Sequence, residues 1–187
     1  TLWNLFLTQG KDFDLRPFGH AALASLRLEA GIPWYGTDFD ESNLFPETGL
    51  EHAVSYDKGC YIGQEVIARL HAVAQVKKKL AGLEMASAAV PSARARVLKD
   101  GREIGTVRSA GFSPYLKKTL ALAYLKRGFE EEGSAVEIEG EGSKIQARVA
   151  GLPFLRLLRT CPGRGGRTSP RSTASFPFTI TYSMPSA

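Results

Sequence analysis

The sequence predicts an α+β fold in which helices and irregular segments come first and a small antiparallel β-barrel follows. Three observations predict this order. Apolar residues recur at helical spacing near the start of the chain, short alternating runs separated by turn signals fill residues 77–154, and residues 155–187 show neither period. We therefore expect domain boundaries at 1–76, 77–154 and 155–187.

The first predicted helix covers residues 17–30. Pro17 suits the first turn of a helix, and Gly31 suits the position just after its end. The apolar residues between them are spaced for one helical face: Phe18, Ala22, Leu23, Leu26 and Ala30.

A long segment without periodicity follows, from residue 31 to residue 59. Irregular segments of this length inside a domain are usually functional or unstructured. Its aromatic residues favour an ordered loop: Trp34, Tyr35, Phe39, Phe45 and Tyr56. Residues 64–70 then predict a short helix in which Glu65 and Arg69 form an i,i+4 ion pair.

From Lys77 onward the sequence alternates as β-strands do. The runs KLAGLEM, ARARVLKDGREIGTVRS, TLALAYL and SAVEIEGEGSKIQARVA carry hairpin signals at KDG and GEG. The pattern predicts a small antiparallel barrel or sandwich over residues 77–154. A length of about 75 residues is near the lower limit for a self-supporting core, so we expect this domain to lean on the first.

Charge is distributed unevenly along the 187 residues. The formal net charge is +5, but five of the 24 Lys and Arg residues lie in the acid-free tail, which leaves 19 basic against 19 acidic residues before it. A phosphate-binding surface on the folded part is therefore not indicated, and nucleic acid is not expected as a partner. The tail is rich in Ser, Thr, Pro and Gly, which predicts disorder. A solvated extension fits it better than an arm that binds RNA or membrane.

The start of the chain and its cysteines bear on its location. No stretch approaches the roughly 20 apolar residues of a membrane span, and TLWNLFLTQGKDFD has neither a basic n-region nor a small-residue cleavage site. Cys60 and Cys161 form no disulfide pattern, as in proteins of reducing compartments. We expect a cytoplasmic protein, or one of the mitochondrial or plastid matrix if it is eukaryotic, with no membrane partner.

The opening of the chain also bears on its completeness. It begins on an apolar run, LWNLFL, without a methionine. One helix and one long loop make a poor core by themselves. We therefore expect a fragment whose N-terminal partner is missing.

Cys60 lies between two glycines in SYDKGCYIGQEVIARL and could carry chemistry. If Gly63 and Gln64 open a helix, the thiol lies near its positive end and two residues from Lys58, and both effects favour the thiolate. Such a thiol could be a nucleophile, a redox group or a metal ligand. The structural alternative is a small residue that fits between the glycines, since cysteine is often buried.

Glu29 lies in the last turn of the first predicted helix. There the helix dipole disfavours a carboxylate by roughly 0.3 to 1 kcal/mol, so another interaction should favour it. A carboxylate can accept two parallel N–H bonds, from an arginine fork or from the amide-and-amino edge of a pterin. Arg27 faces elsewhere on the helix. A structural ion pair with another base and a ligand contact both stay open.

Other site classes are not indicated. GCYIGQE matches neither the phosphate-binding GxxxxGK[ST] loop nor GxGxxG. His20, His52 and His71 lack metal-ligand spacing with one another or with the cysteines, so no zinc site is expected. A dyad of Cys60 with His52 or His71 is compatible with the sequence, because such partners need only be close in the fold. The KKK run at 77–79 is expected to be a solvated strand entry.

The motif KGCYIGQE, at 58–65, resembles the signature of the YgfZ-type folate-binding proteins, which are relatives of the glycine-cleavage T-protein (aminomethyltransferase). The resemblance extends to FGHAALASLRLEAGIPWYGTDFDESNLFPETGL before it, and to KKKLAGLEM, IGTVRSAGFSPYLKKTLALAYL and VAGLPF after it. It covers about residues 3–154. The implied protein is a ring of three subdomains around a tetrahydrofolate cleft. Residues 1–76 would be the C-terminal part of the folate-binding α/β subdomain, and 77–154 the C-terminal β-barrel.

The resemblance also assigns roles to single residues. Glu29, in RLEAG, matches the acidic residue that holds the pterin edge in the T-protein. Cys60 matches the cysteine characteristic of the YgfZ-type branch and is the expected catalytic thiol. Tyr35, Tyr61 and Arg69 are the other expected folate-binding residues. The family's N-terminal portion, which supplies the other wall of the cleft and an acidic residue important in the T-protein, has no counterpart here, and the tail matches nothing in the family.

The implied function is tetrahydrofolate binding in support of iron–sulfur cluster assembly or repair, with iron–sulfur enzymes as clients and tRNA modification as an associated process. One alternative is an aminomethyltransferase that transfers a one-carbon unit to tetrahydrofolate and turns over a lipoyl-carried aminomethyl donor. Another is an RNA-associated protein that acts through its arginine tail, with affinity that falls steeply with salt.

Overall fold

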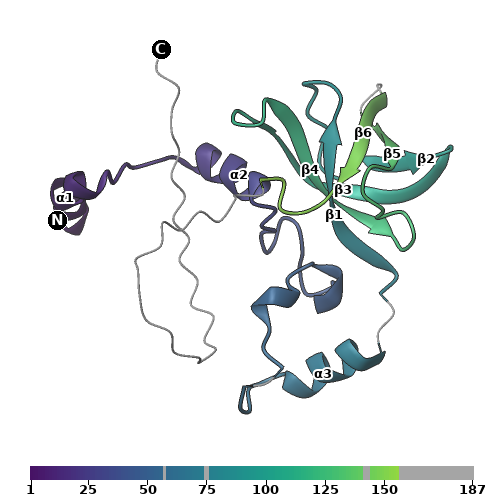
Figure 1. Cartoon of the computed structure of the whole chain (residues 1–187), viewed down its shortest axis with the longest axis horizontal. Helices are drawn as coiled ribbons and strands as arrows, with labels where there is room; N and C mark the ends of the chain where they lie inside the picture. The colour runs from purple at the N-terminus through teal and green to yellow at the C-terminus, as the bar shows by residue number, and fades with distance from the viewer. Residues whose placement is uncertain (57, 74–75, 141–143, 156–187) are drawn as a thin grey trace, which may run out of the picture. The chain divides into compact units, whose positions relative to one another are not determined.

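The computed structural model describes residues 1–56, 58–73, 76–140 and 144–155. The helical elements come first, in chain order: α1 (Leu2–Gln9), η1 (Gly10–Phe13), α2 (His20–Glu29), η2 (Phe45–Glu47), η3 (Glu51–Ala53) and α3 (Gln64–Val73). The strands follow: β1 (Lys78–Met85), β2 (Arg96–Lys99), β3 (Arg102–Ser113), β4 (Lys118–Lys126), β5 (Ala135–Glu139) and β6 (Lys144–Ala150). The predicted α+β class, with helices before strands, is confirmed (Figure 1).

The six strands form a closed antiparallel barrel with the order β1-β4-β3-β2-β5-β6 (Figure 1). The predicted hairpin signal KDG joins β2 to β3, where Lys99 pairs with Arg102. Asp100 and Gly101 between them have φ of 51° and 74°, and two consecutive positive φ values are the geometry of the tight hairpin turn that Asp-Gly favours. The prediction of a barrel is therefore confirmed. The GEG signal lies partly outside the described residues, but β5 and β6 pair on either side of it.

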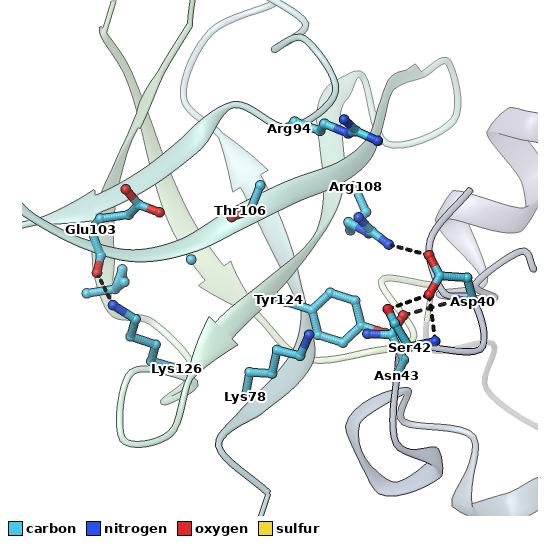
Figure 2. Close-up of a pocket in the computed structure, with 12 residues that line it drawn as sticks. Asp40, Ser42, Asn43, Lys78, Arg94, Glu103, Thr106, Arg108, Tyr124 and Lys126 are labelled. Atoms are coloured by element: carbon cyan, nitrogen blue, oxygen red, sulfur yellow. Dashed lines mark hydrogen bonds and ion pairs between the residues drawn. The ribbon is translucent and has the colours of Figure 1, made fainter. Parts of the chain in front are cut away.

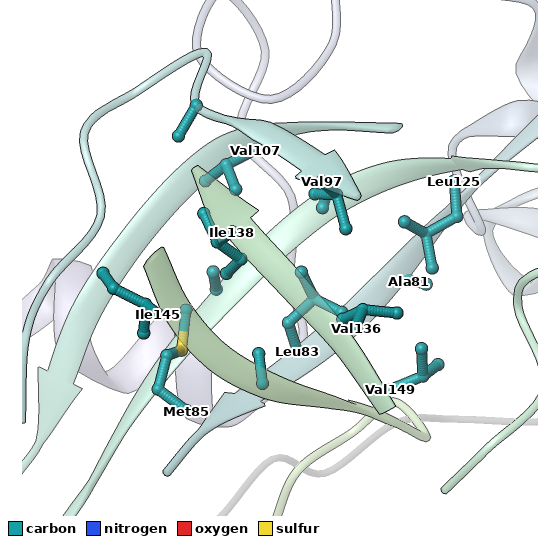
Figure 3. Close-up of a cluster of buried hydrophobic side chains, with 14 of the residues drawn as sticks. Ala81, Leu83, Met85, Val97, Val107, Leu125, Val136, Ile138, Ile145 and Val149 are labelled. Carbon is teal, nitrogen blue, oxygen red and sulfur yellow. The ribbon is translucent and has the colours of Figure 1, made fainter. Parts of the chain in front are cut away.

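Alternation along the strands places the apolar core inside the barrel. Buried and exposed residues alternate along the whole of β6 up to its last position, so Ile145, Ala147 and Val149 point inward. The larger side chains of the core include Leu83, Val97, Val107, Leu125 and Ile138, each 0% exposed (Figure 3). In contrast, all seven residues of β4 between its two terminal lysines are buried, which indicates that both faces of this strand are covered.

A second cluster covers the outer face of β4. Leu28 of α2 packs there with Leu80, Leu122 and Tyr124, and the partly buried Leu152 and Phe154 close the cluster from the segment after β6. That segment also donates a backbone hydrogen bond, from the Leu155 amide to the Glu29 carbonyl at 3.0 Å. The expectation that the barrel leans on the preceding residues is confirmed, with contacts from α2 and from the segment that follows it.

The helices differ from the predictions at their ends. Helix α2 starts at His20 with Gly19 as its N-cap, so Pro17 precedes the helix and does not lie in its first turn. Its end is as predicted, because Gly31 follows the C-cap with φ of 66°. Helix α3 extends beyond residue 70 to Val73. Among the described residues no ion pair joins Glu65 and Arg69, which are both exposed, so that predicted pair is wrong.

Two further features were not predicted. Helix α1 forms from the opening LWNLFLTQ, although none of its residues is buried. Lys78 and Lys79 belong to β1 and form ion pairs with Glu47 and Glu51, at 3.6 and 3.8 Å. The KKK run is therefore not simply a solvated strand entry.

Residues 156–187 lie outside the described residues. The predicted disorder of the tail, apart from Leu155, and the environment of Cys161 fall in this segment. In the part of the chain that the structure describes, no helix is long and apolar enough to cross a membrane.

Candidate functional site

Glu29 is the most buried of the predicted site residues, at 2% exposure. It ends α2, and its Oε1 accepts a hydrogen bond from the Ser113 hydroxyl of β3 at 2.5 Å. The Ser113 hydroxyl oxygen in turn accepts a bond from the Leu116 amide at 3.0 Å, which orients its proton toward the carboxylate. Glu29 is thus held at the junction of α2 and the barrel by a fixed donor.

Asp38 forms a second and larger polar junction between the preceding segments and the barrel. Its side chain is 0% exposed, and Oδ2 pairs with Arg27 of α2 at 2.5 Å and accepts the Trp34 amide at 2.8 Å. Its Oδ1 accepts a short hydrogen bond from the Ser109 hydroxyl of β3. The Arg108 Nε donates to the Asp38 carbonyl at 3.1 Å. We call Arg27, Asp38, Arg108 and Ser109 the Asp38 junction.

The Asp38 junction explains why the aromatic loop is ordered. The predicted order was attributed to aromatic side chains, but Tyr35 and Tyr56 are exposed and Trp34, Phe39 and Phe45 are only half-buried. The Arg27 guanidinium lies 4.6 Å from the centre of the Trp34 ring, so the ring packs on a charge that Asp38 already fixes. A buried acid therefore organises the loop around it.

Tyr35 and its neighbours form an exposed hydrogen-bonded turn. The Tyr35 hydroxyl donates to Glu41, and this hydrogen bond is the main cause that raises the pKa of Tyr35 and lowers the pKa of Glu41. Hydrogen bonds from the side chain and amide of Ser42 hold the pKa of Asp40 below its ordinary value, helped by the charge of Arg108. The predicted folate-binding side chain of Tyr35 thus points to a partner within its own turn.

Cys60, Tyr61 and Arg69 lie in and beside α3. Cys60 is exposed and free, four residues before α3 begins at Gln64, so the packing role between two glycines is wrong. Tyr61 is half-buried and donates to the Ser55 carbonyl at 3.2 Å. The Lys58 ammonium lies 4.6 Å from the centre of the Tyr61 ring. Arg69 is exposed on α3.

Two of the three histidines pack against aromatic rings. His71 packs against Tyr56 with ring centroids 4.3 Å apart, and His20 packs edge-on against Trp34 at 5.7 Å. Within the described ranges no group of three or more His, Cys, Asp or Glu side chains is arranged to hold a metal ion.

A pocket of about 360 Å³ lies on the outside of the barrel, where residues 40–43 of the loop face β3 and β4 (Figure 2). None of the five predicted site residues lines it. Its lining includes four basic residues, which are Lys78, Arg94, Arg108 and Lys126. We call it the basic pocket.

Sequence reasoning missed the partners that position the predicted residues. Ser113 lies in GFSPYL, where a lone serine gives no local signal of a contact 84 residues away. Asp38 could have been suspected as an acid within an aromatic loop. Arg27 was expected on a different helical face from Glu29, and its partner Asp38 was not identified.

Two family models match parts of the chain. Residues 1–58 match the GCVT N-terminal domain, and residues 78–155 match the glycine cleavage T-protein C-terminal barrel domain. The second match coincides with the closed barrel.

Individual relatives of the chain have names that agree with these two domain matches. The aminomethyltransferase of Caldanaerobacter subterraneus subsp. tengcongensis is 34% identical over 156 residues, which are 83% of this chain and 41% of that protein. The aminomethyltransferase of Moorella thermoacetica is 36% identical over 83% of this chain and 42% of its own length. The crystal structure of the glycine cleavage system aminomethyltransferase T from Bartonella henselae superposes with a TM-score of 0.69 at 29% identity, over 81% of this chain and 43% of that one.

The chain thus spans about two-fifths of the length of the curated relatives it matches. Its described elements are those of the barrel domain and of a part of the domain that precedes it. Residues 1–58 and 78–155 of the chain therefore match the two domains of the glycine cleavage T-protein superfamily.

Proposed function

We propose that this chain is the barrel-bearing part of a tetrahydrofolate-binding protein that acts in one-carbon transfer, as an aminomethyltransferase does. The names of the relatives favour this alternative over the predicted main function in iron–sulfur cluster maintenance. On this proposal residues 1–76 contribute one wall of the folate site and residues 77–154 support that wall. The single observation that carries the proposal is the position of Glu29.

Glu29 is suited to bind the pterin edge because its orientation is set before a ligand arrives. The Ser113 hydroxyl fixes Oε1, and a carboxylate has about four acceptor sites, so it can accept further N–H groups while keeping this bond. A charge-assisted pair of hydrogen bonds at a site shielded from water is strong and directional. Glu29 is 2% exposed, so a pterin can reach its carboxylate only if neighbouring groups move.

The other predicted site residues have supporting roles in this proposal. Tyr35 and Tyr61 offer aromatic faces to a flat ring, and Arg69 offers an exposed guanidinium to the carboxylates of the folate glutamate. Cys60 is an exposed thiol and so is accessible to a substrate.

The proposal is tested by titrating tetrahydrofolate by calorimetry into this chain and into a longer chain that restores the family's N-terminal part. We expect Glu29→Gln to weaken binding by about tenfold to a hundredfold, since hydrogen bonds to charged groups contribute roughly 1.5 to 3 kcal/mol. Glu47→Gln is the matched control, because Glu47 is also a buried glutamate, at 6% exposure, but pairs with Lys78. Unchanged affinity of Glu29→Gln in both chains would show that Glu29 only anchors α2.

A second function is favoured by the exposed Cys60 in KGCYIGQE, which resembles the YgfZ-type signature. On this alternative the folate site serves iron–sulfur cluster assembly or repair in client enzymes, and Cys60 is the working thiol. Cys60→Ser should then lower the activity of iron–sulfur enzymes in cells and leave folate affinity nearly unchanged. Turnover of a lipoyl-carried aminomethyl donor by the longer chain, with full activity in Cys60→Ser, would instead support the aminomethyltransferase.

A further inference from the structure

The basic pocket is a site separate from Glu29. It lies on the outer face of the barrel between the turn at residues 40–43 and the strand residues of β1, β3 and β4 (Figure 2). Its volume of about 360 Å³ exceeds the space that a single phosphate or a short dicarboxylate needs. The ligand class follows from its charges.

Four cations and two carboxylates line the basic pocket. The sequence of residues 1–154 has as many basic as acidic residues, so this excess of positive charge is local. Lys126 donates to the backbone carbonyl of Glu103 at 2.8 Å, and a carbonyl does not neutralise an ammonium. Arg94 is exposed, and its side chain has no hydrogen bond or ion pair within the described ranges. Two of the four cations therefore lack an ion-pair partner there.

Tyr124 holds the other two cations in place. The Lys78 ammonium lies 4.9 Å, and the Arg108 guanidinium 5.8 Å, from the centre of the Tyr124 ring. Tyr124 is itself fixed by the cluster with Leu28, and it is 6% exposed. Lys78 and Arg108 reach Glu47 and Asp40 only at 3.6 Å, beyond the usual length of a hydrogen bond. An incoming anion thus meets charges that are already positioned and incompletely paired.

The backbone at Arg94 is also fixed. Its φ is 67°, and its amide donates to the Val107 carbonyl at 2.8 Å, beside the bond from the Val107 amide to Ala95. A guanidinium on a fixed backbone suits bidentate binding of an oxyanion, because its two parallel N–H groups match two oxygens.

We propose that the basic pocket binds a small oxyanion that carries at least two negative charges, in the form of a phosphate group or a dicarboxylate. Arg94 and Lys126 supply the unpaired charges, and Lys78 and Arg108 complete the positive surface. The inference does not depend on folate binding at Glu29.

The test is a titration of the full chain with inorganic phosphate and, separately, with glutarate, followed by amide chemical shifts in two-dimensional NMR at constant ionic strength. We expect saturable shifts around residues 103–108 and 124–126 with at least one of the two probes. Saturation by phosphate alone assigns a phosphate group, and saturation by glutarate alone assigns a dicarboxylate. Shifts that stay linear with both probes up to tens of millimolar overturn the proposal.

Matched variants distinguish binding at specific residues of the basic pocket from a general attraction of anions to positive charge. Arg94→Gln should weaken binding about tenfold, as expected for loss of a charge-assisted hydrogen bond. Arg96→Gln removes the same charge two residues away, where Arg96 pairs with Glu139 at 2.6 Å, and should leave the affinity within about twofold. Equal weakening by the two variants overturns the proposal.

A second matched pair of variants keeps the test valid if Arg94→Gln disturbs the backbone at residue 94, where φ is 67°. Lys126→Gln should also weaken binding by about tenfold. Lys144→Gln, on the far hairpin where Lys144 pairs with Glu137 at 3.2 Å, should have no effect on affinity. Wild-type affinity in Lys126→Gln contradicts the assigned role of its charge.

Discussion

The barrel and the segments before it bury their apolar side chains to very different extents. Among the described residues, Leu28 is the one member of the buried hydrophobic set that precedes β1. Conversely, 13 of the 16 large hydrophobic side chains that are exposed within the described ranges lie before residue 77, among them Trp3, Phe6 and Ile62. The barrel therefore has its own core, whereas the preceding segments are held to it through Leu28 and through polar contacts of Glu29 and Asp38.

This contrast teaches that the two regions depend on different forces. Burial of apolar area stabilises the barrel in proportion to that area and without directional demands. The attachment of the loop instead depends on a few hydrogen bonds around Asp38, each of which needs its partner in place. Substitutions in the two regions should thus have distinguishable effects.

The largest effect is expected from a cavity in the barrel core. Leu83 is 0% exposed, so Leu83→Ala should lower the free energy of unfolding by about 3 to 5 kcal/mol, through lost burial and an unfilled cavity. Urea denaturation followed by far-UV circular dichroism measures this. Ile62→Ala, at a fully exposed position, should change it by less than about 0.5 kcal/mol. A loss below about 1 kcal/mol in Leu83→Ala would mean that the barrel is not the stabilising unit.

A smaller and more local effect is expected at the Asp38 junction. Asp38→Ala leaves Arg27 buried at 6% side-chain exposure without its carboxylate, and loss of one partner of a buried pair costs about 3 kcal/mol. We expect the loop to open while the barrel stays folded, so hydrogen exchange at the Trp34 amide should accelerate by about a hundredfold.

The control for this variant is the exposed pair of Arg16 and Asp14, with side-chain exposures of 74% and 80%. Asp14→Ala should leave both the exchange and the stability nearly unchanged. If Asp38→Ala loses protection against hydrogen exchange in the loop and in the strands together, the barrel does not stay folded independently of the loop.

The smallest effect at neutral pH is expected at Tyr124, which joins the two regions. Burial raises the pKa of Tyr124 from 10.0 to about 12. The folded phenol thus keeps its proton at pH values where the unfolded chain has lost it, so its contribution to stability is complete below pH 10 and is lost as the pH rises toward 12. Absorbance titration near 295 nm, as the difference between wild type and Tyr124→Phe, measures this ionisation.

The hydroxyl of Tyr124 has no hydrogen-bond partner among the described residues. Tyr124→Phe should therefore keep or slightly raise stability at pH 7, and it should reduce the loss of stability in alkali. An ionisation of Tyr124 near pH 10 would show that its surroundings admit water.

The sequence was informative where structure follows from short-range pattern. Alternation and the Asp100-Gly101 turn predicted the barrel, and Gly31 predicted the end of α2, because each depends on neighbouring residues. The start of α2 was predicted too early, since Pro17 is compatible with a first turn but does not require one.

The contacts around the candidate site were not predictable in the same way. The bond from Ser113 to Glu29 joins residues that only the register of β3 against α2 brings together. Likewise, the basic pocket collects Lys78, Arg94 and Lys126 from three separate segments, and the charge count along the chain shows no excess there. Roles for Glu29 and Cys60 came from resemblance to a family, and they stay predictions.

The hydrogen bond from Leu155 to the end of α2 sets an order of events during translation. The ribosome delivers α2 long before the segment after β6, so the carbonyl of Glu29 cannot meet the Leu155 amide until all six strands of the barrel have emerged. The carboxylate of Glu29 can meet the Ser113 hydroxyl earlier, once β3 has emerged. A nascent chain therefore completes the surroundings of Glu29 last, and a ribosome stalled before residue 155 would present a finished helix with an unfinished site.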